Sequence, residues 1–188
     1  MLKVGREHKR GLLLLVLYYT GLRLGEACGL KWEDIDFRNR KISVRRDIDL
    51  HTDDIGKLKS KASQRDVPIP SELYDALIAR RGIGWVFTKR DGQHLERGTA
   101  YSIWKVLMAA VLEVDPSLEQ KNGRCALTAH YLRHNYASIL YNAGVDVLTA
   151  QKFLGHATPH ITLAIYTHLS KEKETADVAL IDKAFENF

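Results

Sequence analysis

The sequence predicts an α+β fold that is mainly helical and carries one small antiparallel sheet. Three observations indicate this class. Helical patterns fill most of the chain after residue 97, two short segments rich in β-branched residues lie near the middle, and the chain has no internal repeat. A chain of 188 residues is long enough for one well-cored domain and hardly long enough for two.

The first half of the chain supplies the predicted sheet. We expect a helix over residues 8–19 and a short second helix from Leu22. Residues 41–49 (KISVRRDID) mix β-branched residues with charges and predict a strand, and residues 65–69 (RDVPI) predict another. We expect these two strands to form an antiparallel hairpin, with residues 85–87 as a candidate third strand.

The second half is predicted to be helical. A helix opens at Pro70 and Ser71 and runs to Arg80, with Ser71 as its N-cap. Gly144 and Gly155 are predicted helix ends, because glycine adopts the left-handed conformation that closes many helices. The remaining helices are expected over residues 97–112, 127–142, 147–153, 159–167 and 171–186.

The composition favours an anionic partner, but only weakly. Lys and Arg number 28 against 23 Asp and Glu, which gives a formal charge of +5 and a pI near 9.2. Cys28 and Cys125 lie far apart, which argues against a metal knuckle or a disulfide framework. The longest apolar run, residues 12–19, is far short of the ~20 residues of a membrane span, so we expect a cytoplasmic protein.

Four local patterns carry residues suited to phosphodiester chemistry. Arginine donates two parallel hydrogen bonds and stays protonated, so it suits the negative charge that grows on a phosphate in the transition state. The leaving oxygen needs a proton donor, and the attacking hydroxyl needs help in losing its proton. The patterns are TGLRLGEACGLKWEDID around Arg23, SKASQRDVPIP around Lys61, HYLRHNYASIL around His130 and Arg133, and LGHATPHITLAIYTHL around His156 and Tyr166.

The ordered set of patterns resembles the tyrosine recombinases, the family of phage and conjugative-transposon integrases and chromosome-dimer resolvases. The resemblance spans residues 20–169. Arg23 in TGLR-x-GE matches the first catalytic arginine of the family, and Glu26 matches its acidic companion. HYLR matches the H-x-x-R motif, which places His130 and Arg133 one helical turn apart.

The remaining catalytic positions follow from the same resemblance. LGH supplies His156, and Tyr166 in IYTHL lies ten positions later, where the family has its nucleophile. The family's lysine lies on a β-hairpin just before an R-x-V/I-P strand, which favours Lys61. Lys59 stays open, because residues two apart point the same way on a strand. The basic run Lys57, Lys59 and Arg65 is expected to bind the DNA backbone.

The resemblance implies the DNA breaking-rejoining fold and a reaction without ATP, metal or other cofactor. Tyr166 attacks a DNA phosphate, forms a 3′-phosphotyrosyl link and frees a 5′ hydroxyl. The implied partner is double-stranded DNA, with a tetramer on synapsed sites and neither a membrane nor a small-molecule substrate. The residues of TGLRLGE and ITLAIYTHL look most like those of mobile-element integrases, which favours integration or excision of a mobile element.

The amino-terminal end of the chain departs from the usual family pattern, whereas the carboxyl-terminal end is compatible with it. Arg23 lies so close to the first residue of the sequence that the amino-terminal core-binding and arm-binding domains do not fit before it. We therefore expect residues 1–188 to be the catalytic domain alone. Residues 171–188 contain an amphipathic stretch. We expect a terminal helix there that docks on a neighbouring protomer, although packing on its own domain is nearly as well supported.

Other interpretations of these residues remain open. His130 and His134 are spaced i, i+4 as in a zinc helix, but HYLRH lacks the glutamate of H-E-x-x-H. Taken alone, Arg23 fits a surface arginine and Tyr166 fits ordinary half-buried packing. At the level of function, the alternatives are a type IB topoisomerase, a non-catalytic DNA-binding protein on the same fold and, third, a metal nuclease.

Overall fold

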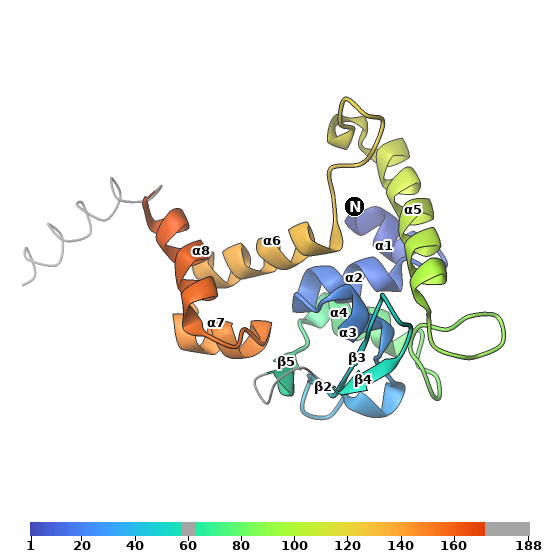
Figure 1. The fold of residues 1–188 in the computed structure, drawn as a ribbon, viewed down its shortest axis with the longest axis horizontal. Helices are drawn as coiled ribbons and strands as arrows, with labels where there is room; N and C mark the ends of the chain where they lie inside the picture. The colour runs from blue at the N-terminus through green and yellow to red at the C-terminus, as the bar shows by residue number, and fades with distance from the viewer. Residues whose placement is uncertain (58–62, 172–188) are drawn as a thin grey trace, which may run out of the picture.

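The computed structural model describes residues 1–57 and 63–171 (Figure 1). It confirms a mainly helical α+β fold with small antiparallel sheets. Within these ranges, no helix combines the length and the apolar character that crossing a membrane requires. The helices are α1 (Leu2–Glu7), α2 (Leu12–Thr20), α3 (Leu24–Cys28), α4 (Ser71–Ile78), α5 (Arg97–Val114), α6 (Ala129–Asn142), α7 (Val147–Leu154) and α8 (Pro159–Lys171), with 3-10 turns at Trp32–Asp34 and Pro116–Leu118.

The main hydrophobic core is built around α2, whose residues 12–17 are all buried. A helix that is apolar on every face needs packing partners all round. α2 has them, because it packs against α1, α3, α4 and α6. Figure 1 shows α2 near the centre of the molecule, between α6 and the strands. The elements that carry Arg23 and Arg133 therefore meet around one rigid helix.

The start of the chain differs from the prediction, because residues 8–11 form a turn between two helices. His8 has an extended backbone after α1, and α2 begins only at Leu12. Glycine permits the close approach of the two helices, since a Cβ on Gly11 would lie 2.5 Å from the carbonyl oxygen of Gly5. The predicted helix over residues 8–19 therefore lacks its first turn.

The predicted hairpin is divided between two small antiparallel sheets. Val44 pairs with Arg65 in the first sheet, and Arg46 pairs with Lys57 in the second. The predicted strand over residues 41–49 is therefore interrupted at Arg45, where its partner changes. The strand orders are β1 (Ile35–Asp36), β2 (Lys41–Val44), β5 (Arg65–Pro68) in one sheet and β3 (Arg46–Ile48), β4 (Ile55–Lys57) in the other.

The third strand of the first sheet is β1, and the prediction of residues 85–87 was wrong. Trp85 forms an isolated bridge with Lys31 outside the named strands. Asp36 accepts hydrogen bonds from the backbone and side-chain amides of Asn39, at 2.9 and 2.7 Å. These bonds stabilise the turn that folds β1 back onto β2, a local interaction that the strand pattern alone did not indicate.

The later helices lie where the sequence predicts them, with one correction at a cap. Pro70 occupies the N-cap of α4, so Ser71 is the first helical residue, and its hydroxyl accepts a hydrogen bond from Arg40 (3.2 Å). Gly144 and Gly155 have φ values of +75° and +66°, as expected of residues that close helices. The predicted helix over 171–186 lies outside the described residues beyond Lys171.

A second, smaller core lies where α6 meets α7 and α8. Figure 1 shows α6 extending away from the main core to α7 and α8, which lie at one end of the molecule. Because three of the aromatic rings at this junction belong to tyrosines, we call it the tyrosine core. Its buried residues are Tyr136, Ala137, Leu140, Ala150, Leu154 and Tyr166, with Tyr141 packed against them.

Candidate active site

A buried carboxylate, Glu26, holds two arginines in place. It accepts hydrogen bonds from the backbone N–H of Arg23 (2.8 Å) and from the guanidinium of Arg23 (2.9 Å). Arg65 donates to both carboxylate oxygens, at 2.8 and 2.9 Å. Burial raises the pKa of Glu26, but the hydrogen bonds and charges of Arg65 and Arg23 outweigh it, so the pKa is lowered overall. Glu26 therefore stays ionised and fixes both guanidinium groups.

Arg133 joins α6 to two other parts of the site. Its guanidinium is buried and donates to the carbonyl of Gly21 (2.8 Å) and to that of Leu154. Gly21 ends α2 with a φ of +61°, and a Cβ there would lie 2.4 Å from the ring of Tyr136. Glycine is thus needed where the chain turns next to α6, and Arg133 ties this turn to the end of α7.

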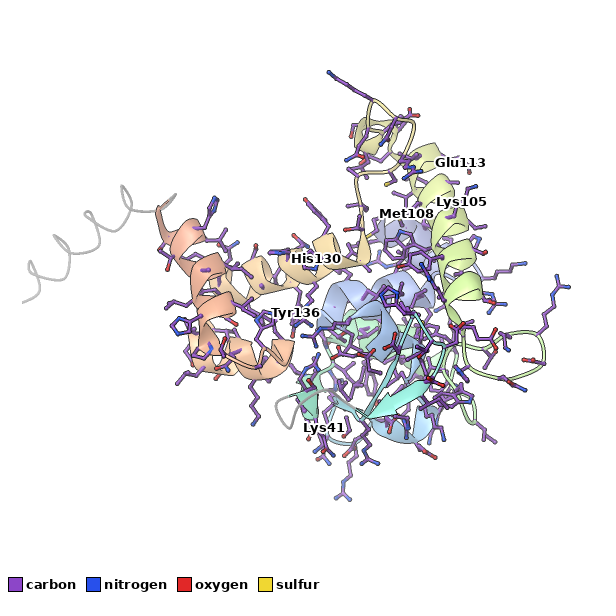
Figure 2. The ribbon with its side chains drawn as sticks, viewed as in Figure 1. Lys41, Lys105, Met108, Glu113, His130 and Tyr136 are labelled. Carbon is purple, nitrogen blue, oxygen red and sulfur yellow. The ribbon has the colours of Figure 1, made fainter. Side chains whose placement is uncertain are left out.

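Two cavities meet at His130 and Arg133. The larger, of about 380 Å³, is also lined by Arg23 and by apolar side chains, and the smaller, of about 50 Å³, is also lined by His134 and His156. Figure 2 shows His130 toward the amino-terminal end of α6 and Tyr136 further along the same helix. Four predicted catalytic residues, Arg23, His130, Arg133 and His156, are therefore brought together.

The positive charge at these cavities is not balanced. Burial and then the charge of Arg23 lower the pKa of Arg133 to about 9, so it is still protonated at neutral pH. Burial and then the charges of Arg133 and Arg23 lower the pKa of His156 to about 4, so its imidazole is neutral at pH 7. Among the described residues that line the two cavities, none is a carboxylate. An anion is the ligand that this arrangement suits.

Tyr166 lies in the tyrosine core and is not among the described residues that line either cavity. Its side chain is 6% exposed, its ring lies 5.0 Å from that of Tyr141, and its hydroxyl donates to the carbonyl of Val145 (3.1 Å). Burial and then the charge of Asp146 raise the pKa of Tyr166. The structure thus shows a protonated phenol that is engaged elsewhere, and it does not bring the predicted nucleophile to the predicted cations.

The basic run has a mixed outcome. Lys59 and Lys61 lie outside the described residues, so the choice of the catalytic lysine stays a prediction. The backbone of Lys57 ends β4. Arg65 is buried, and besides Glu26 it binds the carbonyl of Phe153 (2.7 Å). The buried carboxylate of Glu26 requires a cation beside it, and Arg65 supplies that cation. A side chain buried in this way is at odds with the predicted contact to the DNA backbone.

The paired histidines of α6 line the smaller cavity. The rings of His130 and His134 are in edge-to-face contact, with centroids 4.6 Å apart. Burial and then the charges of His130 and Arg133 lower the pKa of His134. Within the ranges that the structure describes, no group of three or more His, Cys, Asp or Glu side chains is placed to hold a metal ion. Within these ranges, His130 and His134 therefore have no third side chain with which to bind a metal ion.

Sequence reasoning missed several residues that shape the site. Tyr101 and Trp104 of α5 line the larger cavity beside Arg23. Thr162 of α8 is fully buried, with its hydroxyl 2.9 Å from Nδ1 of His156. The aromatic pair could have been noticed as part of the apolar face of α5. For Thr162, only its place between His156 and Tyr166 gave any signal.

A mainly helical domain in which arginines and histidines gather at two adjoining cavities is the arrangement that the motifs resembling the tyrosine recombinases predict. The chain belongs to the phage integrase family, whose model, described as "Phage integrase family", matches residues 5–173. This match covers every predicted catalytic position, including those outside the described residues.

Curated relatives agree with the family assignment. The chain is 30% identical to a tyrosine recombinase XerC-like protein of Caldanaerobacter subterraneus subsp. tengcongensis, over 96% of this chain and 51% of that protein. It is 31% identical to tyrosine recombinase XerA of Pyrococcus furiosus (89% and 54%) and 28% identical to the transposase from transposon Tn916 of Enterococcus faecalis (90% and 45%). The chain spans about half the length of the curated relatives it matches.

Solved structures agree on the fold. The Tn1549 transposon integrase in complex with transposon right end DNA superposes with a TM-score of 0.70 at 26% identity, covering 89% of this chain and 58% of that one. The crystal structure of XerA recombinase gives a TM-score of 0.69 at 24% identity, covering 93% and 60%. The tyrosine-recombinase fold expected from the sequence is confirmed.

Proposed function

We propose that the chain is the catalytic domain of a site-specific DNA recombinase that cuts and rejoins DNA through a 3′-phosphotyrosyl intermediate at Tyr166. The observation that carries this proposal is the unbalanced cationic cavity. Arg23 and Arg133 line it together with His130, and Glu26 neutralises only part of the charge of the arginines around it. A DNA phosphate supplies the missing negative charge, and it gains more stabilisation as its charge grows in the transition state.

Each residue has a role in the proposed reaction. Arg23 and Arg133 hold the non-bridging oxygens, with help from His130 and His156. The Tyr166 oxygen bonds to phosphorus while the bond to the deoxyribose 5′ oxygen breaks, and Lys61 (with Lys59 as the alternative) protonates that leaving oxygen. The bond energy is kept in the phosphotyrosyl ester, so a 5′ hydroxyl can reverse the step without ATP or a metal ion.

The burial of Tyr166 adds a requirement to this mechanism. A phenol has a pKa near ~10 in water, and in the tyrosine core burial raises it further. The Tyr166 hydroxyl must therefore leave the Val145 carbonyl before it can attack, and the cations around the phosphate must then favour its ionised form. The proposed mechanism therefore includes a movement of Tyr166 out of the tyrosine core before the attack.

The partner is proposed to be double-stranded DNA, in a tetramer on synapsed sites. The relationship to the Tn916 transposase and the Tn1549 integrase, the latter solved with transposon end and circular intermediate DNA, favours integration or excision of a mobile element. Residues 171–188 are proposed to dock on the neighbouring protomer. Deletion after Lys173 should then lower multimer formation on DNA in analytical ultracentrifugation, and unchanged assembly would contradict docking in trans.

Covalent capture tests the proposed chemistry. The protein is incubated with a pool of randomised duplexes, each carrying a nick just 3′ of the position to be cut, so that the short product diffuses away and traps the adduct. We expect a band that resists boiling in detergent and whose linkage maps to Tyr166 by mass spectrometry. The band should form equally well in the presence of a chelator.

Matched tyrosine variants make the test specific. Tyr166→Phe should retain DNA binding within about 2-fold and lose the adduct completely, because no oxygen is left to form the ester. Tyr74→Phe, which lies on α4 against Phe37, should form the adduct like the parent protein. An adduct with Tyr166→Phe would disprove the assignment. Binding without any adduct would instead support a non-catalytic protein, and relaxation of supercoils without paired sites would support a topoisomerase.

A further inference from the structure

A buried hydrogen bond connects His156 to the helix that carries Tyr166. Nδ1 of His156 lies 2.9 Å from the hydroxyl oxygen of Thr162, and both side chains are buried. His156 follows Gly155, the left-handed residue that ends α7, whereas Thr162 lies in the first half of α8. The bond therefore spans the connection between the two helices.

The surroundings of Thr162 make its hydroxyl unusual. The side chain has no exposed surface. A buried hydroxyl costs free energy unless it makes a hydrogen bond, and a valine of similar shape would avoid this cost. Within the described part of the chain, the side-chain partner recorded for this hydroxyl is His156.

The hydrogen bond with Thr162 determines which ring nitrogen of His156 is available to the cavity. A neutral imidazole carries one N–H, and the partner of one nitrogen decides whether the other donates or accepts. At neutral pH His156 is in the neutral form. Since Nδ1 is engaged with Thr162, Nε2 is the nitrogen left for the cavity that His156 shares with Arg133 and His134.

We propose that Thr162 is a positioning residue whose hydroxyl donates a hydrogen bond to Nδ1 of His156. This bond keeps the imidazole proton on Nε2, which can then donate a hydrogen bond to the DNA phosphate. Phosphate oxygens accept hydrogen bonds, so this is the tautomer that the bound substrate requires. Thr162 also lies four residues before Tyr166, which places the two on the same face of α8. The alignment of His156 is therefore coupled to the helix of the nucleophile.

The tautomer of His156 can be measured in the free protein. ¹⁵N-labelled protein is studied by long-range proton–nitrogen NMR, in which the two ring nitrogens have distinct shifts. We expect the Nε2–H tautomer in the parent protein and in Thr162→Ser, and a mixture of tautomers in Thr162→Val. A parent protein with the proton on Nδ1, or a Thr162→Val variant with an unchanged tautomer, would overturn the proposal. The measurement on the parent protein requires no variant to fold.

Cleavage rates test the consequence of this alignment, and this part rests on the proposed function. On nicked duplexes, Thr162→Val should slow adduct formation by about 10- to 100-fold, the range known for residues that orient a metal-bound histidine. DNA binding should stay within about 2-fold, and Thr162→Ser should restore most of the rate. Thr167→Val makes the same change at an exposed position of α8 and should have no effect.

A double-mutant cycle separates positioning from a general structural role. If Thr162 acts through His156, then Thr162→Val should cause no further loss of rate in a protein that already carries His156→Ala. A full additional loss in that background would show that Thr162 acts through the fold and not through His156. If the parent protein forms no adduct at all, the proposed function fails, whereas the tautomer measurement still decides the role of Thr162.

Discussion

The two halves of the site are held by different parts of the molecule. Arg23, Glu26 and Arg65 form a network of charge-assisted hydrogen bonds at α3 and β5, next to the main core. Tyr166 belongs to the tyrosine core, where ring packing and one recorded hydrogen bond from its hydroxyl hold it. The arginines are thus fixed by several strong interactions, and the proposed nucleophile, Tyr166, by weaker ones.

This difference matches the demands of the proposed reaction. Stabilisation of a developing negative charge works best when the donors are already in place, because no free energy is then lost to reorganisation. An attacking tyrosine, in contrast, must be withheld until the correct DNA is bound. We therefore expect substitutions in the charged network to damage the fold severely, and substitutions around Tyr166 to be tolerated.

The largest effect is expected from removal of the central charge. Glu26→Gln keeps the shape of the side chain but leaves the charge of Arg65 buried without a counterion. Breaking a buried ion pair from one side costs about 3 to 5 kcal/mol. Urea denaturation at pH 7, followed by circular dichroism, should show a loss of stability of this size.

An exposed ion pair provides the control. Glu33 is paired with Arg46 at 3.4 Å, and its side chain is 64% exposed. Because such pairs contribute little in water, Glu33→Gln should change the free energy of unfolding by less than about 1 kcal/mol. Equal losses for the two variants would mean that the Glu26 network contributes no more to stability than an ion pair with an exposed partner.

A smaller effect is expected where the network touches α7. Gly155 has a φ of +66°, and a Cβ there would lie 2.7 Å from Nη1 of Arg65. Arg65 has little freedom to move aside, because it is bound to Glu26 and to the Phe153 carbonyl. Gly155→Ala therefore adds a steric cost of about 1 to 3 kcal/mol to the cost of the left-handed backbone.

Substitution of Gly144 measures the cost of a left-handed backbone without any steric contact. Its φ is +75°, but a Cβ there would meet nothing within 4 Å. Gly144→Ala should cost about 1 to 2 kcal/mol, the usual cost of a left-handed alanine. The difference between the two alanine variants in thermal or urea denaturation measures the contact with Arg65, and no difference would show that Arg65 moves freely.

The sequence predicted that Arg23, His130, Arg133 and His156 would gather, but neither the position of Tyr166 nor how each residue is held. Spacing alone placed His130 and Arg133 one turn apart on α6, and the ordered motifs predicted that Arg23 and His156 would join them. The ion pair between Glu26 and Arg65 joins residues 39 positions apart in the chain. Such a long-range contact leaves no local pattern, so Arg65 was taken for a surface residue.

The same limit explains the errors in the fold. The strand pattern of residues 41–49 is continuous, and the change of partner at Arg45 depends on where β4 and β5 lie in space. The position of Tyr166 was not predictable either, because a motif suggests a chemical role and does not specify where the side chain packs. Burial of its ring depends on packing with Tyr141, another tertiary contact.

Of the substitutions at the proposed site, Tyr166→Phe is expected to have the smallest effect on stability. Tyr166→Phe keeps the ring in the tyrosine core and removes the hydrogen bond to Val145, which should cost about 0.5 to 1.5 kcal/mol of stability in urea denaturation. A small value is what release of the nucleophile requires, since contacts with DNA must offset it before catalysis. A loss as large as that of Glu26→Gln would mean that Tyr166 is a fixed part of the core, and the proposed movement toward the phosphate would then be untenable.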